Sequence, residues 1–456
     1  MGSSISVKTK TALFGNYNDK SNMLRESLRK AGFTGPIFVL EDAAFMPEDM
    51  ISVFHYTIRQ MQGVNPSGKA RYFNEIDIPA FWHIEANNIE GTIYDKETVR
   101  GKIYYSNHNP MQNRLVKQVD WYSTNGIKTS SDYYDQYGLR YGRMTYDSLG
   151  MEFQMSWFSL DGQEVLTENK KTGDFILQYR GNMYIFQNLT ELTLYVMRDY
   201  ENRFNVELTD ILYNTLHYPF FVSLRWEGTR EQGDYLFWQE QPREDIPGNM
   251  MSIFEHKTKT THIYVQNMES YQNLLEAGAD RELLSPLGFI YNYQKENQGG
   301  NEVLICTNSD QLEHLEDIVK RFPRMHFHVC AVTEMSQKLL GLGKYDNLSL
   351  YPSVSMAMVV ELFQKCDYYL DINHGGQILD AVKTAYLYEQ LIVGIEITVH
   401  NREYIAPEYI FADWEDMCAF LDKVFPKSDL HQELAAQKRR GIDEDVAAYQ
   451  KLLFNV

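Results

Sequence analysis

Glu302-Val303-Leu304-Ile305-Cys306 decides the fold, because it has the composition of a short buried strand and is followed by two good helix caps, Asn308 and Ser309. The same pairing of an apolar run with an amphipathic stretch repeats to the end of the chain. We expect strands at residues 325–332, 348–351, 367–372, 391–395 and 409–411, and helices at 311–322, 334–340, 353–365, 377–389, 414–424 and 430–453. Strands that alternate with helices of this length predict right-handed crossovers and a parallel, doubly wound sheet.

The N-terminal part of the chain begins in the same way and then changes its period. A strand at 11–14, a helix at 20–30 and a strand at 36–40 are expected first. Between residues 68 and 186 apolar and polar residues mostly alternate, as in a meandering antiparallel sheet, with turn signals at 107–110, 125–126, 161–162 and 172–173. Beyond residue 189 we expect helices at 189–200 and 268–277 and strands at 219–226 and 261–266.

These patterns predict an α/β protein with a pair of Rossmann-like domains and an antiparallel all-β insertion in the first. The expected boundaries are 1–67 and 187–287 for domain one, 68–186 for the insertion, and 288–456 for domain two. A ligand cleft is expected between the two α/β domains, at the carboxyl ends of their strands.

Charge and cysteine usage limit the classes of partner and compartment. The 456 residues carry a formal net charge of −19, which disfavours nucleic acid and anionic lipid at long range. The four cysteines lie far apart without a CxxC pair, so we expect reduced thiols and neither a disulfide framework nor a zinc site. Residues 1–10 lack the apolar core of a signal peptide, and the longest apolar runs are too short to span a bilayer. The sequence thus predicts a cytoplasmic protein, with membrane association at most peripheral at the inner face.

Aromatic residues are unusually frequent. Tyrosine alone contributes 32 residues, and Phe, Trp and Tyr together make up 14% of the chain. Either tyrosine fills half-buried sheet faces, or it forms a surface for sugars, peptides or a partner subunit, because its ring is apolar and its tip is polar.

Several motifs, spread over nearly the whole chain, resemble one family. They are Tyr72-Phe73-Asn74-Glu75-Ile76, Phe81-Trp82-His83-Ile84, Gly101-Lys102-Ile103-Tyr104-Tyr105, Val119-Asp120-Trp121-Tyr122, Tyr369-Leu370-Asp371-Ile372-Asn373-His374-Gly375-Gly376 and Ile378-Leu379-Asp380-Ala381. The family is the stabilising or chaperone subunit, often called GtfB, of the transferase pair that O-glycosylates serine-rich-repeat adhesins of the accessory Sec system in Gram-positive bacteria.

The resemblance implies a GT-B fold, a catalytic sister subunit and a role in binding the unfolded Ser/Thr-rich adhesin polypeptide. The sister subunit would transfer N-acetylglucosamine or glucose from a UDP-sugar, while a chain like this one would transfer no sugar by itself. No cofactor and no catalytic residue are therefore expected here. Contact with the catalytic subunit is expected from the β insertion, with Tyr104, Tyr105, Trp121 and Tyr122 as candidates.

The residues at the expected donor site agree with a pseudo-enzyme. A retaining GT-B enzyme holds the UDP pyrophosphate with an Arg and a Lys shortly after the first strand of domain two, near a helix N-terminus. Here that stretch is Thr307-Asn308-Ser309-Asp310-Gln311, which has no basic residue and has a carboxylate that would repel phosphate. Such an enzyme usually also has one glutamate that binds the nucleotide ribose and another near the donor sugar, separated by seven residues. When Asp380 is aligned with the second of these, the apolar Ile372 stands at the position of the first.

The candidate cleft residues lie after the first strand of domain one, Asn16 and Tyr17, and after the 367–372 strand, Asp371, Asn373, His374, Gly375, Gly376 and Asp380. Each has a plainer alternative. Asp380 either keeps a ligand role or charges the first turn of a helix, and Asp371 either faces a ligand or forms a turn. His374 is either catalytic or a hydrogen-bonded loop residue, and the two glycines either approach a ligand or permit a turn. His326 and His328 share a strand face without a third ligand, so no metal site is expected.

Two other functions remain open. One is an active retaining transferase that takes its phosphate contacts from elsewhere, for example Arg225, Arg230 or backbone amides. Binding of a UDP-sugar by the isolated chain would favour it. The other is a scaffold for already glycosylated protein, which a preference for glycopeptide over bare peptide would favour.

Overall fold

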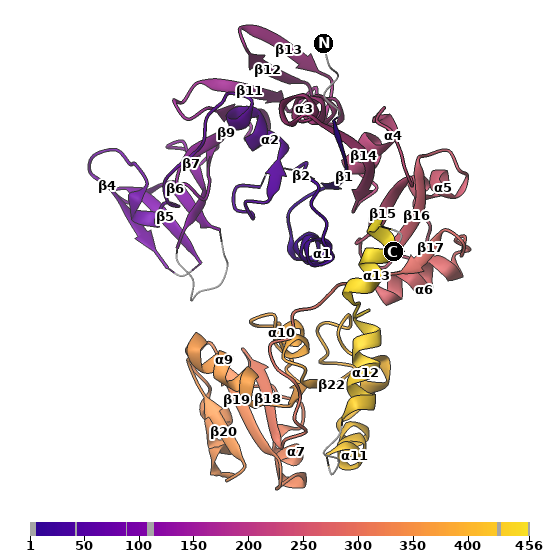
Figure 1. The fold of residues 1–456 in the computed structure, drawn as a ribbon. Helices are drawn as coiled ribbons and strands as arrows, with labels where there is room; N and C mark the ends of the chain where they lie inside the picture. Colours follow the sequence, from indigo (N-terminus) through magenta and orange to yellow (C-terminus); the bar gives the residue numbers. More distant parts are fainter. Residues whose placement is uncertain (1–5, 42, 88, 107–113, 426–429, 455–456) are drawn as a thin grey trace. The chain divides into compact units, whose positions relative to one another are not determined.

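The computed structural model describes residues 6–41, 43–87, 89–106, 114–425 and 430–454 (Figure 1). The chain divides into two compact units, which we describe separately. The first comprises residues up to Tyr264 with Asn273–Ser285, and the second comprises Val265–Gln272 with the residues from Pro286 onward.

The first unit contains a doubly wound sheet. Within the described residues its seven strands have the order β17-β16-β15-β14-β1-β2-β3, and the strands from β15 to β3 pair in parallel. Counted in chain order this is the Rossmann pattern, in which the strand order reverses between β1 and its neighbour β14. The strands are β1 (Val7–Phe14), β2 (Ile37–Val39), β3 (Met50–Ser52), β14 (Val206–Tyr213), β15 (Asp234–Trp238), β16 (Thr260–Val265) and β17 (Leu284–Pro286).

Helices follow these strands along the chain. They are α1 (Asp19–Lys30), α2 (Val53–His55), the π-helix η1 (Tyr56–Gln60), α3 (Leu189–Phe204), α4 (Tyr218–Arg225), α5 (Gly248–Phe254) and α6 (Met268–Glu276), whose residues are divided between the two units. Helix α1 starts where the sequence predicts, because the Asn18 side chain and Ser21 form a reciprocal capping box.

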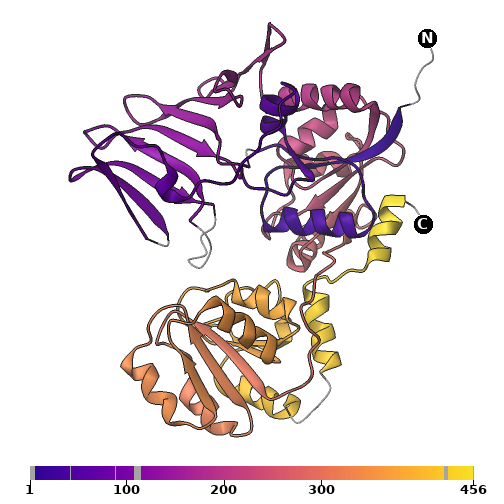
Figure 2. The ribbon, with the colours of Figure 1, turned by 60° about the vertical axis from the view of Figure 1, so that its left-hand side comes forward.

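An antiparallel meander, with ten strands among the described residues, is inserted between η1 and α3 (Figures 1 and 2). Its strands pair in chain order and are β4 (Trp82–Ala86), β5 (Glu90–Asp95), β6 (Thr98–Tyr105), β7 (Val116–Tyr122), β8 (Lys128–Tyr134), β9 (Arg140–Tyr146), β10 (Glu152–Phe158), β11 (Glu164–Asn169), β12 (Phe175–Tyr179) and β13 (Asn182–Phe186), preceded by the 3-10 turn η2 (Phe73–Glu75). The insertion is anchored to the rest of its unit by Phe54, which stacks on Trp157 with the ring centroids 4.5 Å apart, and by the buried ion pair of Arg59 with Asp135.

The second unit contains the second doubly wound sheet, with the described order β20-β19-β18-β21-β22-β23 and a reversal between β18 and β21. All neighbouring strands are parallel. The strands are β18 (Glu302–Thr307), β19 (His326–Ala331), β20 (Leu348–Tyr351), β21 (Tyr368–Asp371), β22 (Leu391–Ile395) and β23 (Ile410–Phe411). The helices are α7 (Leu315–Arg321), α8 (Gln337–Leu340), η3 (Gly341–Lys344), α9 (Met356–Lys365), α10 (Ala381–Leu387), η4 (Pro407–Tyr409), α11 (Trp414–Val424), α12 (His431–Arg440) and α13 (Val446–Phe454).

The predicted fold class is confirmed, whereas some elements differ from expectation. The segment expected as a strand at 219–226 belongs instead to helix α4, which ends at Arg225, and Pro219 lies in its first turn, where a missing N–H is harmless. The expected helix at 430–453 is two helices, which separate at Gly441. Strands β14 and β15 were missed, and the turn expected at 107–110 lies outside the described residues. In the part of the chain that the structure describes, no helix combines the length and apolarity needed to cross a membrane.

Candidate functional site

Each doubly wound sheet has one position where a ligand is expected, namely the carboxyl ends of the two strands between which the strand order reverses. In the second unit this switch point lies between the loop after β18, which starts at Asn308, and the loop after β21, which starts at Ile372. In the first unit it lies between Gly15, after β1, and Asn214, after β14. The two switch points differ: side chains close the one in the second unit, and the one in the first unit is an open pocket.

The switch point of the second unit is closed by Asn373. This side chain is only 2% exposed. Its Oδ1 accepts from the Thr307 hydroxyl at 2.8 Å and from the Gly375 backbone N–H at 3.0 Å, and its Nδ2 donates to the Gly375 carbonyl at 3.2 Å and to Asn308 Oδ1 at 3.4 Å. The loops after β18 and β21 are thus hydrogen-bonded to each other at the place where a GT-B donor phosphate would lie.

Gly375 brings these loops into direct contact. A Cβ atom at this position would lie 2.0 Å from Asn308 Oδ1, whereas one at Gly376 would find its nearest neighbour, Asn308 Nδ2, at 3.8 Å. Gly375 is therefore required by a close approach between two pieces of this chain. This contact differs from both roles expected for the glycines, because it joins two loops of the chain and neither glycine has a positive φ.

A second group of hydrogen bonds holds the loop after β21. We call it the Asp371–His400 clamp, because it joins His400 to Asp371 at the end of β21. The 1% exposed carboxylate accepts from the His400 backbone N–H and from His400 Nδ1, both at 2.7 Å, and His400 Nε2 lies 2.7 Å from the Gly375 carbonyl. The hydrogen bond to Asp371 raises the pKa of His400 above its ordinary value of 6.5, burial opposes this, and the Gly375 carbonyl adds to it. Asp371 therefore holds the loop and is turned toward the protein.

The charges around this switch point do not suit a pyrophosphate. Neither loop, 307–314 or 372–380, contains Lys or Arg. Asp380 has a left-handed backbone conformation at the start of α10, where it makes no cap hydrogen bond with its side chain, and Lys383 is 4.0 Å from it. The N-terminus of helix α10 thus carries the Asp380 carboxylate, and the nearby Lys383 ammonium is paired with it.

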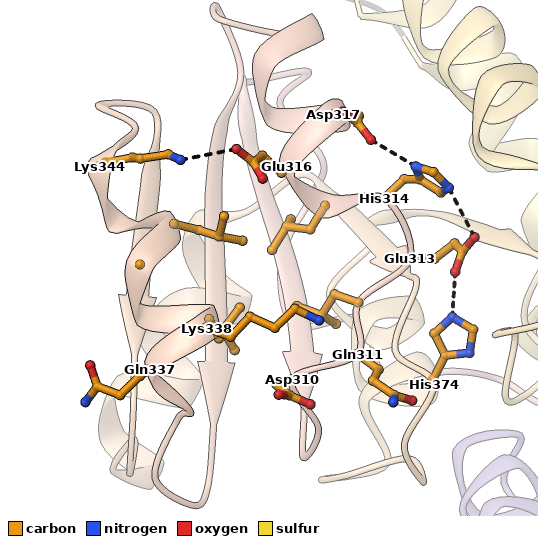
Figure 3. Close-up of a pocket in the computed structure, with 15 residues that line it drawn as sticks. Asp310, Gln311, Glu313, His314, Glu316, Asp317, Gln337, Lys338, Lys344 and His374 are labelled. Atoms are coloured by element: carbon orange, nitrogen blue, oxygen red, sulfur yellow. Dashed lines mark hydrogen bonds and ion pairs between the residues drawn. The ribbon is translucent and has the colours of Figure 1, made fainter.

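An open cavity of about 660 Å³ lies beside the closed switch point, over α7 and α8 (Figure 3). Figure 3 shows His374, Glu313 and His314 in a row along its wall: His374 Nε2 lies 2.6 Å from Glu313 Oε2, and His314 is 3.7 Å from the other oxygen. Four carboxylates and two lysines line the cavity, Asp310, Glu313, Glu316, Asp317, Lys338 and Lys344. This excess of negative charge disfavours a nucleotide.

The switch point of the first unit is open and forms a pocket of about 580 Å³. Amide side chains dominate its wall, namely Asn16, Asn18, Asn214, Gln239 and Gln241. Asn214 organises them, because its Oδ1 accepts from the Gly15 N–H at 2.9 Å and its Nδ2 donates to Gln239 Oε1 at 2.9 Å. Asn16 and Gln241 are exposed and face solvent.

The chemistry of this pocket suits an uncharged polar ligand. Its single described cation, Arg243, is held by Asp245 through two bonds of 2.7 and 2.8 Å, and the remaining charged groups on the wall are Glu41 and Glu240. Carboxamides donate and accept hydrogen bonds in the same way as a peptide group, and they also pair with hydroxyl groups. The wall therefore matches a polypeptide backbone with Ser or Thr side chains better than it matches a phosphate.

The structure separates the predicted cleft residues into three places. Asn16 lines the first unit's pocket, whereas Tyr17 is not among the residues that line it. Asp371, Asn373, Gly375 and Gly376 surround the closed switch point of the second unit, with Asp380 at the start of α10. His374 faces the acidic cavity. Sequence reasoning missed His400, Asn214 and Gln239, because their roles arise from strands whose neighbours are distant in sequence.

The four aromatic candidates of the insertion lie on opposite faces of its sheet. Tyr105 is 2% exposed and belongs to the hydrophobic core, and Trp121 packs against that core and donates from Nε1 to Asp132 at 2.9 Å. Tyr104 and Tyr122 lie on the other face, as the pairings Tyr104↔Gln118 and Gly101↔Trp121 require. Burial, and then the neighbouring Tyr104, raises the pKa of Tyr122 to about 12. A surface contact is thus available to Tyr104 and Tyr122, while Tyr105 acts only through packing.

Comparison with known proteins agrees with this architecture. Residues 11–56, 82–187 and 189–277 match the models of the GtfB N-terminal, middle and third domains, and residues 303–437 match the GftB/GlyA-F C-terminal domain. The UDP-N-acetylglucosamine–peptide N-acetylglucosaminyltransferase stabilizing protein GtfB of Streptococcus gordonii is 35% identical over 97% of both chains, and its counterpart in Streptococcus pneumoniae is 34% identical over 97% of this chain and 99% of its own.

Solved structures show the same likeness. One chain of the crystal structure of a GtfA/B complex bound to UDP and GlcNAc is 33% identical, with a TM-score of 0.87 over 98% of this chain and 99% of that chain. The pneumococcal O-GlcNAc transferase GtfA, at 12% identity and a TM-score of 0.50 over 98% and 96% of the two chains, shares the fold alone. From its sequence over nearly the full length and from its fold, this chain belongs to the GtfB family of N-acetylglucosaminyltransferase stabilising proteins.

Proposed function

We propose that this protein is the non-catalytic, acceptor-binding subunit of a protein O-glycosyltransferase complex in the cytoplasm. It stabilises a catalytic partner, which transfers N-acetylglucosamine, or glucose, from a UDP-sugar to Ser and Thr residues of a serine-rich adhesin. Two likenesses support this assignment: the curated relatives are named stabilising proteins, and the structural relative at 33% identity is part of a GtfA/B complex.

The observation that carries the proposal is the closed switch point of the second unit. A donor nucleotide needs positive charge and open backbone amides there, and this chain has Asn373 hydrogen-bonded across the gap and no Lys or Arg in either loop. The adjacent cavity is acidic. Sugar transfer by this chain alone therefore lacks a donor site, which argues against the alternative of an active transferase.

The acceptor is assigned to the amide-lined pocket at the switch point of the first unit. An unfolded Ser/Thr-rich polypeptide has many peptide groups and hydroxyls and little apolar surface. Its recognition therefore requires hydrogen-bond donors and acceptors and not a hydrophobic pocket. Asn16, Asn18 and Gln241 are exposed amides there, and Asn18 also caps helix α1. We assign the contact with the catalytic partner to the face of the insertion that carries Tyr104 and Tyr122.

Isothermal titration of the purified chain tests this function. The expected result is binding of a Ser/Thr-rich acceptor polypeptide and no binding of UDP-N-acetylglucosamine or UDP-glucose. Binding of a UDP-sugar with release or transfer of the sugar would refute the proposal and identify an active transferase. A marked preference for the glycosylated polypeptide over the bare one would instead identify a glycopeptide scaffold.

A further inference from the structure

The two edge strands of the ten-stranded sheet are built differently. At one edge, the open face of β4 presents His83 and Glu85, whose side chains are 51% and 69% exposed and 3.7 Å apart. Charged groups of this kind protect a sheet edge from pairing with another chain. At the other edge, the open face of β13 presents Met183 and Ile185, which are 66% and 64% exposed. Strand β13 contains no charged residue and no proline.

The hairpin turn before β13 determines which of its backbone N–H and C=O groups are not paired with β12. Arg180 and Gly181 both have positive φ, 52° and 74°, and connect Tyr179 to its partner Asn182 as a two-residue hairpin turn. Such a turn closes on a hydrogen-bonded pair, and hydrogen-bonded and non-hydrogen-bonded pairs alternate along the ladder. The N–H and C=O groups of Met183 and Ile185 therefore point away from β12. In the described part of the chain no other strand pairs with this side of β13.

The strand is complementary to itself. A two-fold axis through Tyr184 sets Met183 opposite Ile185 of a second copy and Ile185 opposite its Met183. These two pairs are the ones whose free N–H and C=O groups face outward, so each exchanges two hydrogen bonds. The same alignment places Met and Ile side by side on one face, which is a favourable cross-strand contact. The absence of charge within the strand allows contact between two chains that each carry a net charge of −19.

We propose that β13 pairs antiparallel with β13 of a second copy of this chain, so that two insertion sheets join into one. A five-residue edge buries little area, and small interfaces are weak. The dimer is therefore expected to form reversibly and to increase with protein concentration.

Light scattering coupled to gel filtration, carried out on the full chain over a range of concentrations, tests this contact. The expected result is a mass that rises from one chain to two. Ile185→Pro removes an outward N–H and leaves the β12 ladder intact, so this variant should remain a monomer with an unchanged circular-dichroism spectrum. Met183→Lys should also dissociate the dimer, because it places a charge opposite Ile185. Leu149→Lys is the control, since Leu149 is an 84% exposed apolar residue in the turn between β9 and β10, away from this edge, and this variant should dimerise normally.

A cross-link gives a second measurement. Tyr184→Cys places one thiol against its own copy across the two-fold axis, and the four native cysteines are all buried. Mild oxidation should give a covalent dimer that the additional Ile185→Pro change abolishes. A wild-type chain that stays monomeric at every concentration would overturn the proposal. So would a dimer that survives both Ile185→Pro and Met183→Lys, or one that Leu149→Lys dissociates.

Discussion

At Gly375 a single methyl group tests whether the second unit's switch point is closed. Gly375→Ala would drive a Cβ into Asn308 Oδ1, 2.0 Å away, and we expect it to lower the free energy of unfolding by about 1–3 kcal/mol, as overpacking does. Gly376→Ala is the matched control, because its Cβ has its nearest neighbour at 3.8 Å and should be nearly neutral. Urea unfolding measures both, and equal stabilities of the two variants would contradict the closed arrangement.

The Asp371–His400 clamp predicts a pH dependence of stability. The pKa of His400 is raised in the folded chain, chiefly by Asp371, so its stabilising charge is fully present below the ordinary pKa and is lost as the pH rises through the folded value. His400→Asn should therefore cost about 2 kcal/mol at about pH 6 and clearly less at about pH 9. Thermal unfolding of both proteins at the two pH values measures the difference. A cost that does not change with pH would show that His400 is neutral in the folded chain.

At the scale of elements, we expect two substitutions at one core position of the β insertion to differ strongly in their effect on stability. Tyr105 is buried in the insertion's hydrophobic core, and its hydroxyl has no hydrogen-bond partner among the described residues. Tyr105→Phe removes a buried hydroxyl without leaving a cavity and should leave stability unchanged or raise it. Tyr105→Ala should lower it by about 3–5 kcal/mol. Thermal unfolding checks both, and a destabilising Tyr105→Phe would mean that the hydroxyl has a partner.

The pattern of apolar residues predicted the elements of the second unit best, since β22, β20 and α11 have the expected bounds. It failed where the pattern was ambiguous, as in the short, largely apolar segment of α4, which periodicity alone does not distinguish from a strand. The candidate site was less predictable. The missing basic residues were visible in the sequence, but the Asn373 contacts and the His400 clamp depend on which strands become neighbours in the sheet.

At the scale of the whole molecule, the amide-lined pocket predicts a loss of acceptor binding without a loss of assembly. Asn16→Ala combined with Gln241→Ala removes two exposed carboxamides, at about 1 kcal/mol for each hydrogen bond, so acceptor affinity should fall by roughly tenfold or more. Gln298→Ala, an exposed amide of the other unit, should change nothing. Titration with the acceptor and gel filtration with the catalytic partner separate the two effects. Unchanged acceptor affinity in the double variant would place the acceptor elsewhere.

The position of the insertion in the chain also sets the order of events during synthesis. Gly15 and Asn214 meet across 199 positions of sequence, because β1 and its neighbour β14 flank the whole insertion. A ribosome needs roughly 10 to 40 s to make that length of chain, so β1 emerges long before its partner. During this interval, the last four residues of β1, which are buried in the finished sheet, remain without their neighbour. The first strand to be made is thus among the last to be completed, and the nascent chain is most exposed to misassembly before β14 emerges.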